Sequence, residues 1–160
     1  MPAFVRPLIV IACLLAGCGN QIGDACIVST DCSTDGTREC DTSQFQGYCT
    51  ILGCDYDTCP NEAECVRFFS GEFSNKPCTQ DMTTAPSMCS EDELCALDGF
   101  CVPRASEQRY CMLKCSSDGD CRDHYECRDL TKMIDHGGEP VLAPGLSVDE
   151  GTPRFCAPSP

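Results

Sequence analysis

The sequence predicts a small disulfide-rich fold with little regular structure, built from short hairpins and single helical turns. The chain has 160 residues, of which 18 are Cys and none is Trp. From Cys18 onward, 22 of 143 residues are Ile, Leu, Val or Phe, below the roughly 20% that a fold with an ordinary hydrophobic core contains. Disulfides are therefore expected to replace much of that core.

The first seventeen residues have the pattern of a secretion signal. Arg6 is the only early charge, and residues 8–16 form an apolar run. This run is too short to span a bilayer, which takes about 20 apolar residues. The signal ends in Leu15-Ala16-Gly17-Cys18, which resembles the lipobox of bacterial lipoproteins. The resemblance implies that residues 1–17 are cleaved away and that the Cys18 thiol carries a diacylglyceryl group.

The number of cysteines favours this interpretation over the alternative, in which Cys18 is the first cysteine of the folded module. Cys13 lies inside the signal, so a lipidated Cys18 leaves 16 cysteines, an even number that can pair completely. Gly19 replaces the Asp that often retains lipoproteins at the inner membrane. The resemblance therefore implies an exported, lipid-anchored protein, with the outer membrane favoured over the inner. Residues 18–25 are expected to form the lipidated N-terminus and a short tether.

The 16 remaining cysteines divide into four consecutive sets of four. An aromatic residue precedes the last cysteine in three sets, and a Glu precedes the third cysteine in three. The sets are Cys26, Cys32, Cys40 and Cys49; Cys54, Cys59, Cys65 and Cys78; Cys89, Cys95, Cys101 and Cys111; and Cys115, Cys121, Cys127 and Cys156. A competing division has two lobes, residues 26–78 and 89–160, joined by a polar linker at 79–88. The two divisions are compatible if the sets pair into lobes.

The sequence leaves the disulfide pairing open, since even four cysteines allow three connectivities. We predict first-to-third and second-to-fourth pairing within each set, because interleaved loops constrain a short segment more tightly than separate rings. The predicted pairs are Cys26–Cys40, Cys32–Cys49, Cys54–Cys65, Cys59–Cys78, Cys89–Cys101, Cys95–Cys111, Cys115–Cys127 and Cys121–Cys156.

Local patterns place short elements between the cysteines. Residues 61–64 and 90–93 have a helix-capping pattern, which predicts single helical turns. Residues 46–51 and 98–102 have a turn followed by apolar residues, which predicts small hairpins. Residues 128–155, rich in Gly and Pro, are expected to form an exposed loop that Cys156 closes.

The chain is strongly acidic. It has 25 Asp and Glu, all after the signal, against 10 Lys and Arg once Arg6 is set aside, so the net charge beyond the signal is about -15. Nucleic-acid binding needs a basic surface, so no nucleic-acid partner is expected. The acidity is interpreted as a solvated surface that keeps an exported protein soluble.

Metal and cofactor chemistry finds little support in the spacing. No two cysteines are separated by two residues, the arrangement that favours zinc, iron–sulfur or thioredoxin-like sites, so no metal and no cofactor are predicted. Asp118, Asp120, Asp123 and Glu126 suggest a calcium loop. Arg122 and Asp123, however, stand where an EF-hand-type loop needs an oxygen ligand and a Gly, so a polar turn is the simpler interpretation and weak calcium binding stays open.

Catalytic residues are equally scarce, and we predict no enzymatic activity. His124 and His136 are the only histidines and lie in no hydrolase, metalloprotease or phosphate-binding motif. Residues 67–69 and Phe73 form a local aromatic cluster, expected to pack against disulfides or, alternatively, to form a contact patch.

The cysteine pattern also has a family resemblance. Cys89 to Cys101, followed by Cys111, Cys115 and Cys121 to Cys127, is similar to the N-terminal cysteine-rich region of Dickkopf-type proteins and to cysteine-rich repeats in bacterial lipoproteins, although the adjacent Cys-Cys pair of the Dickkopf pattern is absent. The resemblance implies an extracellular binding module. We therefore predict a membrane-tethered binding or structural module with a protein or envelope-polymer partner. The alternatives are an inhibitor of secreted hydrolases or a secreted enzyme that uses His124 or His136.

Overall fold

The predicted class, a small disulfide-rich fold, is confirmed. The computed structural model describes residues 20–70, 76–79 and 89–160. Every cysteine in these ranges belongs to a disulfide. The eight bonds are Cys26–Cys40, Cys32–Cys49, Cys54–Cys65, Cys59–Cys111, Cys78–Cys95, Cys89–Cys101, Cys115–Cys127 and Cys121–Cys156.

Six of these bonds coincide with predicted pairs, and two predictions are wrong. Cys59 bonds to Cys111 rather than Cys78, and Cys95 bonds to Cys78 rather than Cys111. The physical reason is strand pairing: β3 (Ala63–Phe69) and β6 (Glu107–Cys115) are antiparallel neighbours, and their register places Cys65 opposite Cys111. Cys111 is thereby brought next to the disulfide of Cys65 and out of reach of the third set.

The disulfides define four copies of one structural unit. Each copy has two interleaved bonds, first to third and second to fourth cysteine, and the third and fourth cysteines face each other across an antiparallel strand pair. Unit 1 contains Cys26, Cys32, Cys40 and Cys49; unit 2 contains Cys54, Cys59, Cys65 and Cys111; unit 3 contains Cys78, Cys89, Cys95 and Cys101; unit 4 contains Cys115, Cys121, Cys127 and Cys156. The facing pairs are Cys40 and Cys49, Cys65 and Cys111, Cys95 and Cys101, and Cys127 and Cys156. Unit 3 is therefore inserted into unit 2, between its third and fourth cysteines.

Units 2 and 4 share a central five-stranded sheet with the order β7-β9-β6-β3-β8. The strand pair of unit 4, β7 (Tyr125–Arg128) and β9 (Arg154–Pro158), joins that of unit 2 because β9 also pairs with the end of β6. The short strand β8 (Glu139–Pro140) covers the other edge of β3. Residues assigned to the two predicted lobes therefore form one sheet, and Cys59–Cys111 bonds across the same division. Residues 80–88 of the predicted linker lie outside the described residues.

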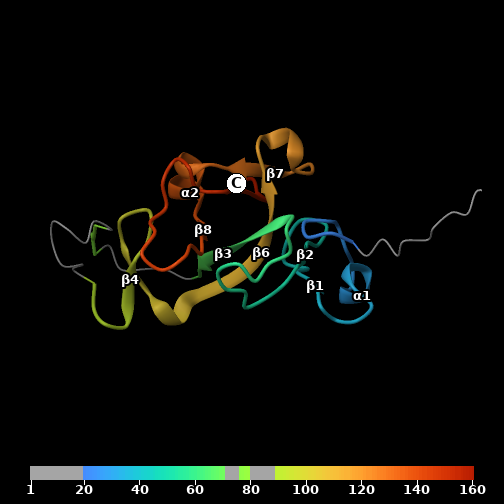
Figure 1. The fold of residues 1–160 in the computed structure, drawn as a ribbon, viewed down its shortest axis with the longest axis horizontal. Helices are drawn as coiled ribbons and strands as arrows, with labels where there is room; N and C mark the ends of the chain where they lie inside the picture. The colour runs from blue at the N-terminus through green and yellow to red at the C-terminus, as the bar shows by residue number, and fades with distance from the viewer. Residues whose placement is uncertain (1–19, 71–75, 80–88) are drawn as a thin grey trace, which may run out of the picture.

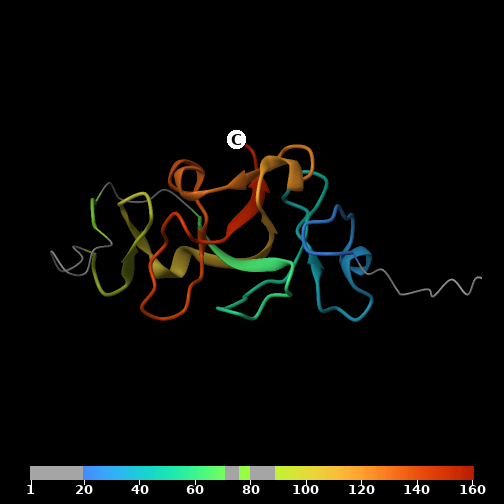
Figure 2. The ribbon, with the colours of Figure 1, turned by 45° about the horizontal axis from the view of Figure 1, so that its top comes forward.

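Units 1 and 3 occupy opposite ends of the molecule (Figures 1 and 2). Unit 1 carries α1 (Ser29–Cys32) and the two-stranded pair β1 (Glu39–Cys40) and β2 (Cys49–Thr50). Unit 3 carries the pair β4 (Glu93–Cys95) and β5 (Cys101–Pro103), followed by the 3-10 turn η1 (Arg104–Ser106). The four units thus make an elongated molecule with the shared sheet in the middle.

Polar side chains close the turn at the start of three units. Asp31, Thr58 and Asp120 each directly precede the second cysteine of a unit. Each accepts a hydrogen bond from a backbone N–H just after the first cysteine, as in the 2.8 Å bond from Asp55 N to Thr58 Oγ1. These bonds hold α1 and the 3-10 turn η2 (Asp118–Asp120) in place. The helical turns predicted at 61–64 and 90–93 are wrong, because β3 begins at Ala63 and β4 at Glu93.

A compact core supports the disulfides. Its largest fully buried side chains include Tyr48, Val66, Met133 and Phe155, which come from four different segments and pack in one cluster with Ile22. The Tyr48 hydroxyl accepts a hydrogen bond from Leu113 N at 2.9 Å. Burial of the phenol away from water raises its pKa. Neither α1 nor α2 (Leu130–His136), the helices in the described part of the chain, is long and apolar enough to cross a membrane.

Candidate binding surface

The segment expected to present a loop, residues 128–155, is only partly exposed. Its first half contains α2 and β8, and Met133 and Glu139 are buried against the sheet. Arg67 fixes this half to β3, because its Nε and Nη2 donate to Glu139 Oε2 at 3.0 and 2.7 Å. The longer exposed stretches of this segment are residues 134–137, at the end of α2, and residues 144–147 and 149–151 in the second half. The expectation of an exposed closed loop therefore holds only for parts of the segment.

The tip of this segment is a tight turn. Leu146 N donates to Ala143 O at 3.1 Å, and Gly145 has a φ of +88°, a value that favours glycine. The turn holds Leu146 outward with 67% of its surface exposed. Pro144 and Gly145 are typical turn residues and could have indicated the turn, but nothing in the sequence indicated which apolar residue would face solvent.

A groove of about 480 Å³ runs between this turn and unit 3. Its lining combines apolar side chains, namely Leu94, Val141, Leu142, Leu146 and Val148, with charged ones, namely Arg67, Glu93 and Arg104. A smaller hollow of about 310 Å³ lies on the other side of the same turn, against residues 56–65. A lining of several apolar side chains with a few charged groups is compatible with binding a partner through an apolar segment.

The aromatic side chains Phe68 and Phe69 of the predicted cluster belong to the fold rather than to this surface, whereas Arg67 beside them lines the groove. Phe68 meets Tyr110 and Phe155 edge to face, with ring centroids 6.0 and 6.2 Å apart. The guanidinium of Arg67 lies 5.8 Å from the Phe69 ring centroid. Phe73, the remaining member, lies outside the described residues.

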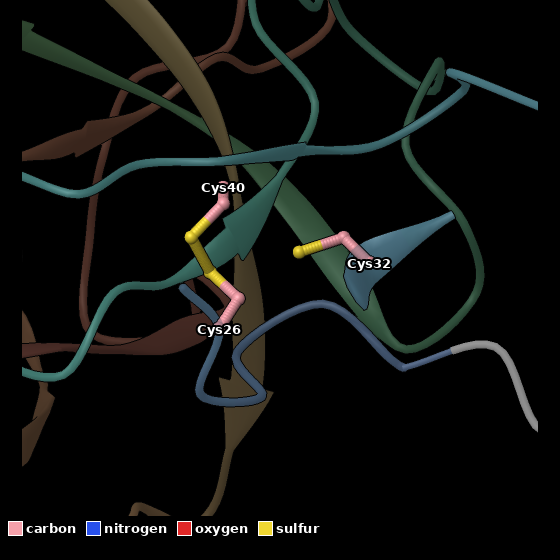
Figure 3. Close-up of side chains that lie close together, drawn as sticks. All are labelled: Cys26, Cys32 and Cys40. Atoms are coloured by element: carbon pink, nitrogen blue, oxygen red, sulfur yellow. A yellow bond between two sulfur atoms is a disulfide. The ribbon is translucent and has the colours of Figure 1, made fainter. Parts of the chain in front are cut away.

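The cysteines lie in tight groups that would resemble metal sites if they were reduced. In each unit three sulfur atoms lie within 4.8 Å of one another. Figure 3 shows the group in unit 1, where Cys26 is bonded to Cys40 and the sulfur of Cys32 lies beside them. Cys32 is itself bonded to Cys49. Zinc sites and iron–sulfur clusters require thiolates, so these oxidised cysteines serve as covalent cross-links.

The acidic residues near Asp118 satisfy backbone donors and lysines of the protein itself. Asp120 Oδ2 accepts from Ser116 N and Ser117 N at 2.7 and 2.9 Å, and these bonds lower the pKa of Asp120. Asp118 Oδ1 accepts from Lys132 Nζ and Cys127 N, both at 2.8 Å, and the pKa of Asp118 is lowered mainly by the lysine. Within the described ranges these carboxylates do not converge on a common point with a third acid.

The two histidines lie in different settings. His124 has a φ of +67°, and its ring centroid lies 4.3 Å from that of Phe45. His136 ends α2, with its Nδ1 2.6 Å from Glu126 Oε1. The same Glu126 oxygen accepts from Arg128 Nε, while Arg128 Nη1 donates to the carbonyls of His136 and Gly137 at 2.8 Å. This network joins α2 to β7. The fold itself therefore accounts for the buried pair of Glu126 and Arg128, and no bound substrate is needed to explain it.

Arg122 is a feature that sequence reasoning missed. Its guanidinium lies 4.1 Å from the Tyr125 ring centroid and 5.4 Å from that of Tyr48, and its Nη2 donates to Phe45 O at 3.0 Å. The contact joins unit 4 to unit 1. An arginine after a cysteine carries no sequence signal for this role.

Cys18, the predicted lipidation site, lies outside the described residues, but the chain from Asn20 onward is fixed. Ile22 is 1% exposed, Gly23 N donates to Cys49 O at 2.9 Å, and Arg38 donates to the carbonyl of Asn20. Residues 20–25, expected to be a tether, are thus packed on unit 1.

Comparisons with models of protein families, with curated proteins and with solved structures find no match for this chain. The resemblances to lipoproteins and to Dickkopf-type repeats therefore stay predictions.

Proposed function

We propose that this chain is an exported binding module, tethered to a membrane through a lipid on Cys18, that presents the groove between unit 3 and the 143–146 turn to a partner. The observation that carries the proposal is the complete pairing of the 16 cysteines from Cys26 onward in four copies of one unit. Such a set of bonds forms in an oxidising compartment outside the cytosol. It supplies rigidity that the small core does not, and a rigid surface loses little entropy on binding.

The expected partner is a protein or an envelope polymer with an exposed apolar segment. The groove offers apolar side chains together with Arg67, Glu93 and Arg104, a combination suited to an apolar segment flanked by polar groups. The strong negative charge argues against nucleic acid. The absence of a recognisable catalytic motif in the sequence argues for binding rather than catalysis.

The tether is supported by the lipobox-like residues 15–18 and by the even cysteine count. Mass spectrometry of the mature N-terminus tests it. We expect a diacylglyceryl-modified Cys18 as the first residue, and Cys18→Ser should release the protein from the membrane fraction. A mature chain that begins elsewhere without acyl groups would contradict the tether.

The binding surface is tested by partner capture from cell envelopes with three forms of the protein. Native protein should retain a defined partner, and reduced protein should lose it because the units open. Leu146→Asp should lose it as well, since a charge would stand in the groove. Leu52→Asp is the matched control, because Leu52 is 49% exposed and does not line the groove. Equal capture by native protein and Leu146→Asp would refute this surface.

A further inference from the structure

The end of the molecule that carries unit 1 has an apolar tip. Ile27 is 82% exposed and Val28 52% exposed, the two adjacent residues just before α1. Their backbone N–H groups donate to Asp31 Oδ2 at 2.8 and 3.1 Å. The tip therefore presents two aliphatic side chains with its backbone donors already satisfied, which suits an environment poor in water.

Acidic side chains near this tip also accept hydrogen bonds from backbone N–H groups. Asp24 Oδ2 accepts from Gln21 N at 2.7 Å, as Asp31 accepts from the tip. Both carboxylates thus serve backbone donors of unit 1 while staying exposed, and the two side chains that the tip itself presents are apolar.

The lipid site is very close to this end of the molecule. The chain is packed on unit 1 from Asn20 onward, since Asn20 O accepts from Arg38 and Ile22 lies in the core. Only Gly19 separates Asn20 from Cys18. Consecutive Cα atoms are about 3.8 Å apart, so the Cα of Cys18 lies within about 8 Å of that of Asn20.

The proposed binding groove lies at the other end. In Figures 1 and 2 α1 and the start of the described chain are at one end, and β4 is at the opposite end. Leu94 of β4 lines the groove together with Leu146. A surface that holds unit 1 therefore leaves the groove free.

We propose that the bilayer is the partner of this tip: the protein stands end-on, with Ile27 and Val28 in the interfacial layer and the groove facing away. This rests on the lipid anchor of the proposed function. The tether of about 8 Å leaves unit 1 no room to leave the membrane surface, and burial of the two exposed aliphatic side chains then stabilises one orientation. The chain beyond the signal has a net charge of about -15 and is repelled by anionic lipids, so the contact is apolar and needs no lipid charge.

The chain has no Trp, so a single introduced Trp reports on its own position. We would place it at the tip (Ile27→Trp) or, as the matched control, at the exposed turn of the groove (Leu146→Trp), in lipidated protein reconstituted in phosphatidylcholine vesicles. The Ile27→Trp emission should shift to shorter wavelength on reconstitution and be quenched by acyl chains brominated near the headgroup. The Leu146→Trp emission should do neither.

The outcomes distinguish the end-on orientation from the lipid anchor on which it rests. Vesicle flotation of both variants with no quenching at position 27, or with equal quenching at 27 and 146, would overturn the end-on orientation and leave the anchor standing. Failure of both variants to float, with the same result for the unsubstituted chain, would overturn the anchor and the orientation together.

Discussion

The disulfide Cys59–Cys111 offers the sharpest test of the fold, because the sequence and the structure disagree there. It closes 52 residues, the longest sequence separation among the eight bonds. In the chain-entropy description, removing a cross-link of this length costs about 4 kcal/mol of the free energy of unfolding. Cys78–Cys95 closes 17 residues, so its removal should cost about 3 kcal/mol.

The perturbation is the double variant Cys59→Ala/Cys111→Ala, with Cys78→Ala/Cys95→Ala as the matched control. Both should fold without free thiols, and guanidinium unfolding should show the larger loss for the first. A third variant, Cys59→Ala/Cys78→Ala, removes the pair that the sequence predicted. It should contain two free thiols, because Cys95 and Cys111 then lose their partners and belong to different units.

Thiol titration of the denatured proteins measures this directly. Two thiols in Cys59→Ala/Cys111→Ala, together with none in Cys59→Ala/Cys78→Ala, would refute the pairing and with it the insertion of unit 3 into unit 2. A loss of stability for the first variant well below that of its control would refute the argument from loop length.

Three further perturbations test other parts of the fold. Phe155→Ala removes a ring that is 0% exposed and should cost about 3 to 5 kcal/mol in denaturant unfolding; a cost below 1 kcal/mol would mean that Phe155 is not a core residue. Gly47→Ala would place a Cβ 2.1 Å from the carbonyl oxygen of Cys26 at a φ of +67°, so oxidative refolding should give far less native protein than wild type. Gly36→Ala is the control, because φ is positive there too but a Cβ meets nothing within 4 Å, and its refolding yield should fall less. Equal yields for the two variants would contradict the close approach at Gly47. Backbone hydrogen bonds from Ile27 and Val28 lower the pKa of Asp31, so the contribution of Asp31 to stability is present above its unfolded pKa of about 3.9 and is lost as the pH falls through its lower folded pKa. The melting temperature of Asp31→Asn should therefore lie below that of wild type at pH 7 and approach it at pH about 2. A difference in melting temperature that does not change with pH would contradict this.

Much of the disulfide pattern was predictable because it is local. Interleaved pairing holds in all four units, and in units 1, 3 and 4 the four cysteines follow one another with no other cysteine between them, so local chain segments bring them together. The error concerned Cys78 and Cys111, each of which the sequence assigned to the wrong neighbour. A signal for the correct grouping was present: with the observed units an aromatic residue precedes the last cysteine in all four, since Phe100 precedes Cys101.

The candidate surface was less predictable, for a different reason. The sequence indicated that residues 128–155 would form a presented loop, but half of this segment is held against β3 by the Arg67–Glu139 pair. Those residues are 72 positions apart, and nothing local to either indicates the contact. Likewise, the sequence did not show whether Ile22 belongs to a tether or to the core, because its burial depends on what the rest of the chain places around it.

The sequence by itself determined the number of cysteines after residue 18 and their even count, and it predicted the interleaved pairing within short segments. Composition also determined that disulfides, rather than a large core, stabilise the chain. Only the tertiary structure decided that unit 3 is inserted into unit 2, because that depends on β3 pairing with β6, a strand distant in the sequence, in a register that sets Cys65 opposite Cys111. The same long-range packing fixed Asn20 to unit 1 and set the turn at 143–146 beside unit 3, since contacts between distant segments are favoured by burial and strand pairing that no local pattern encodes.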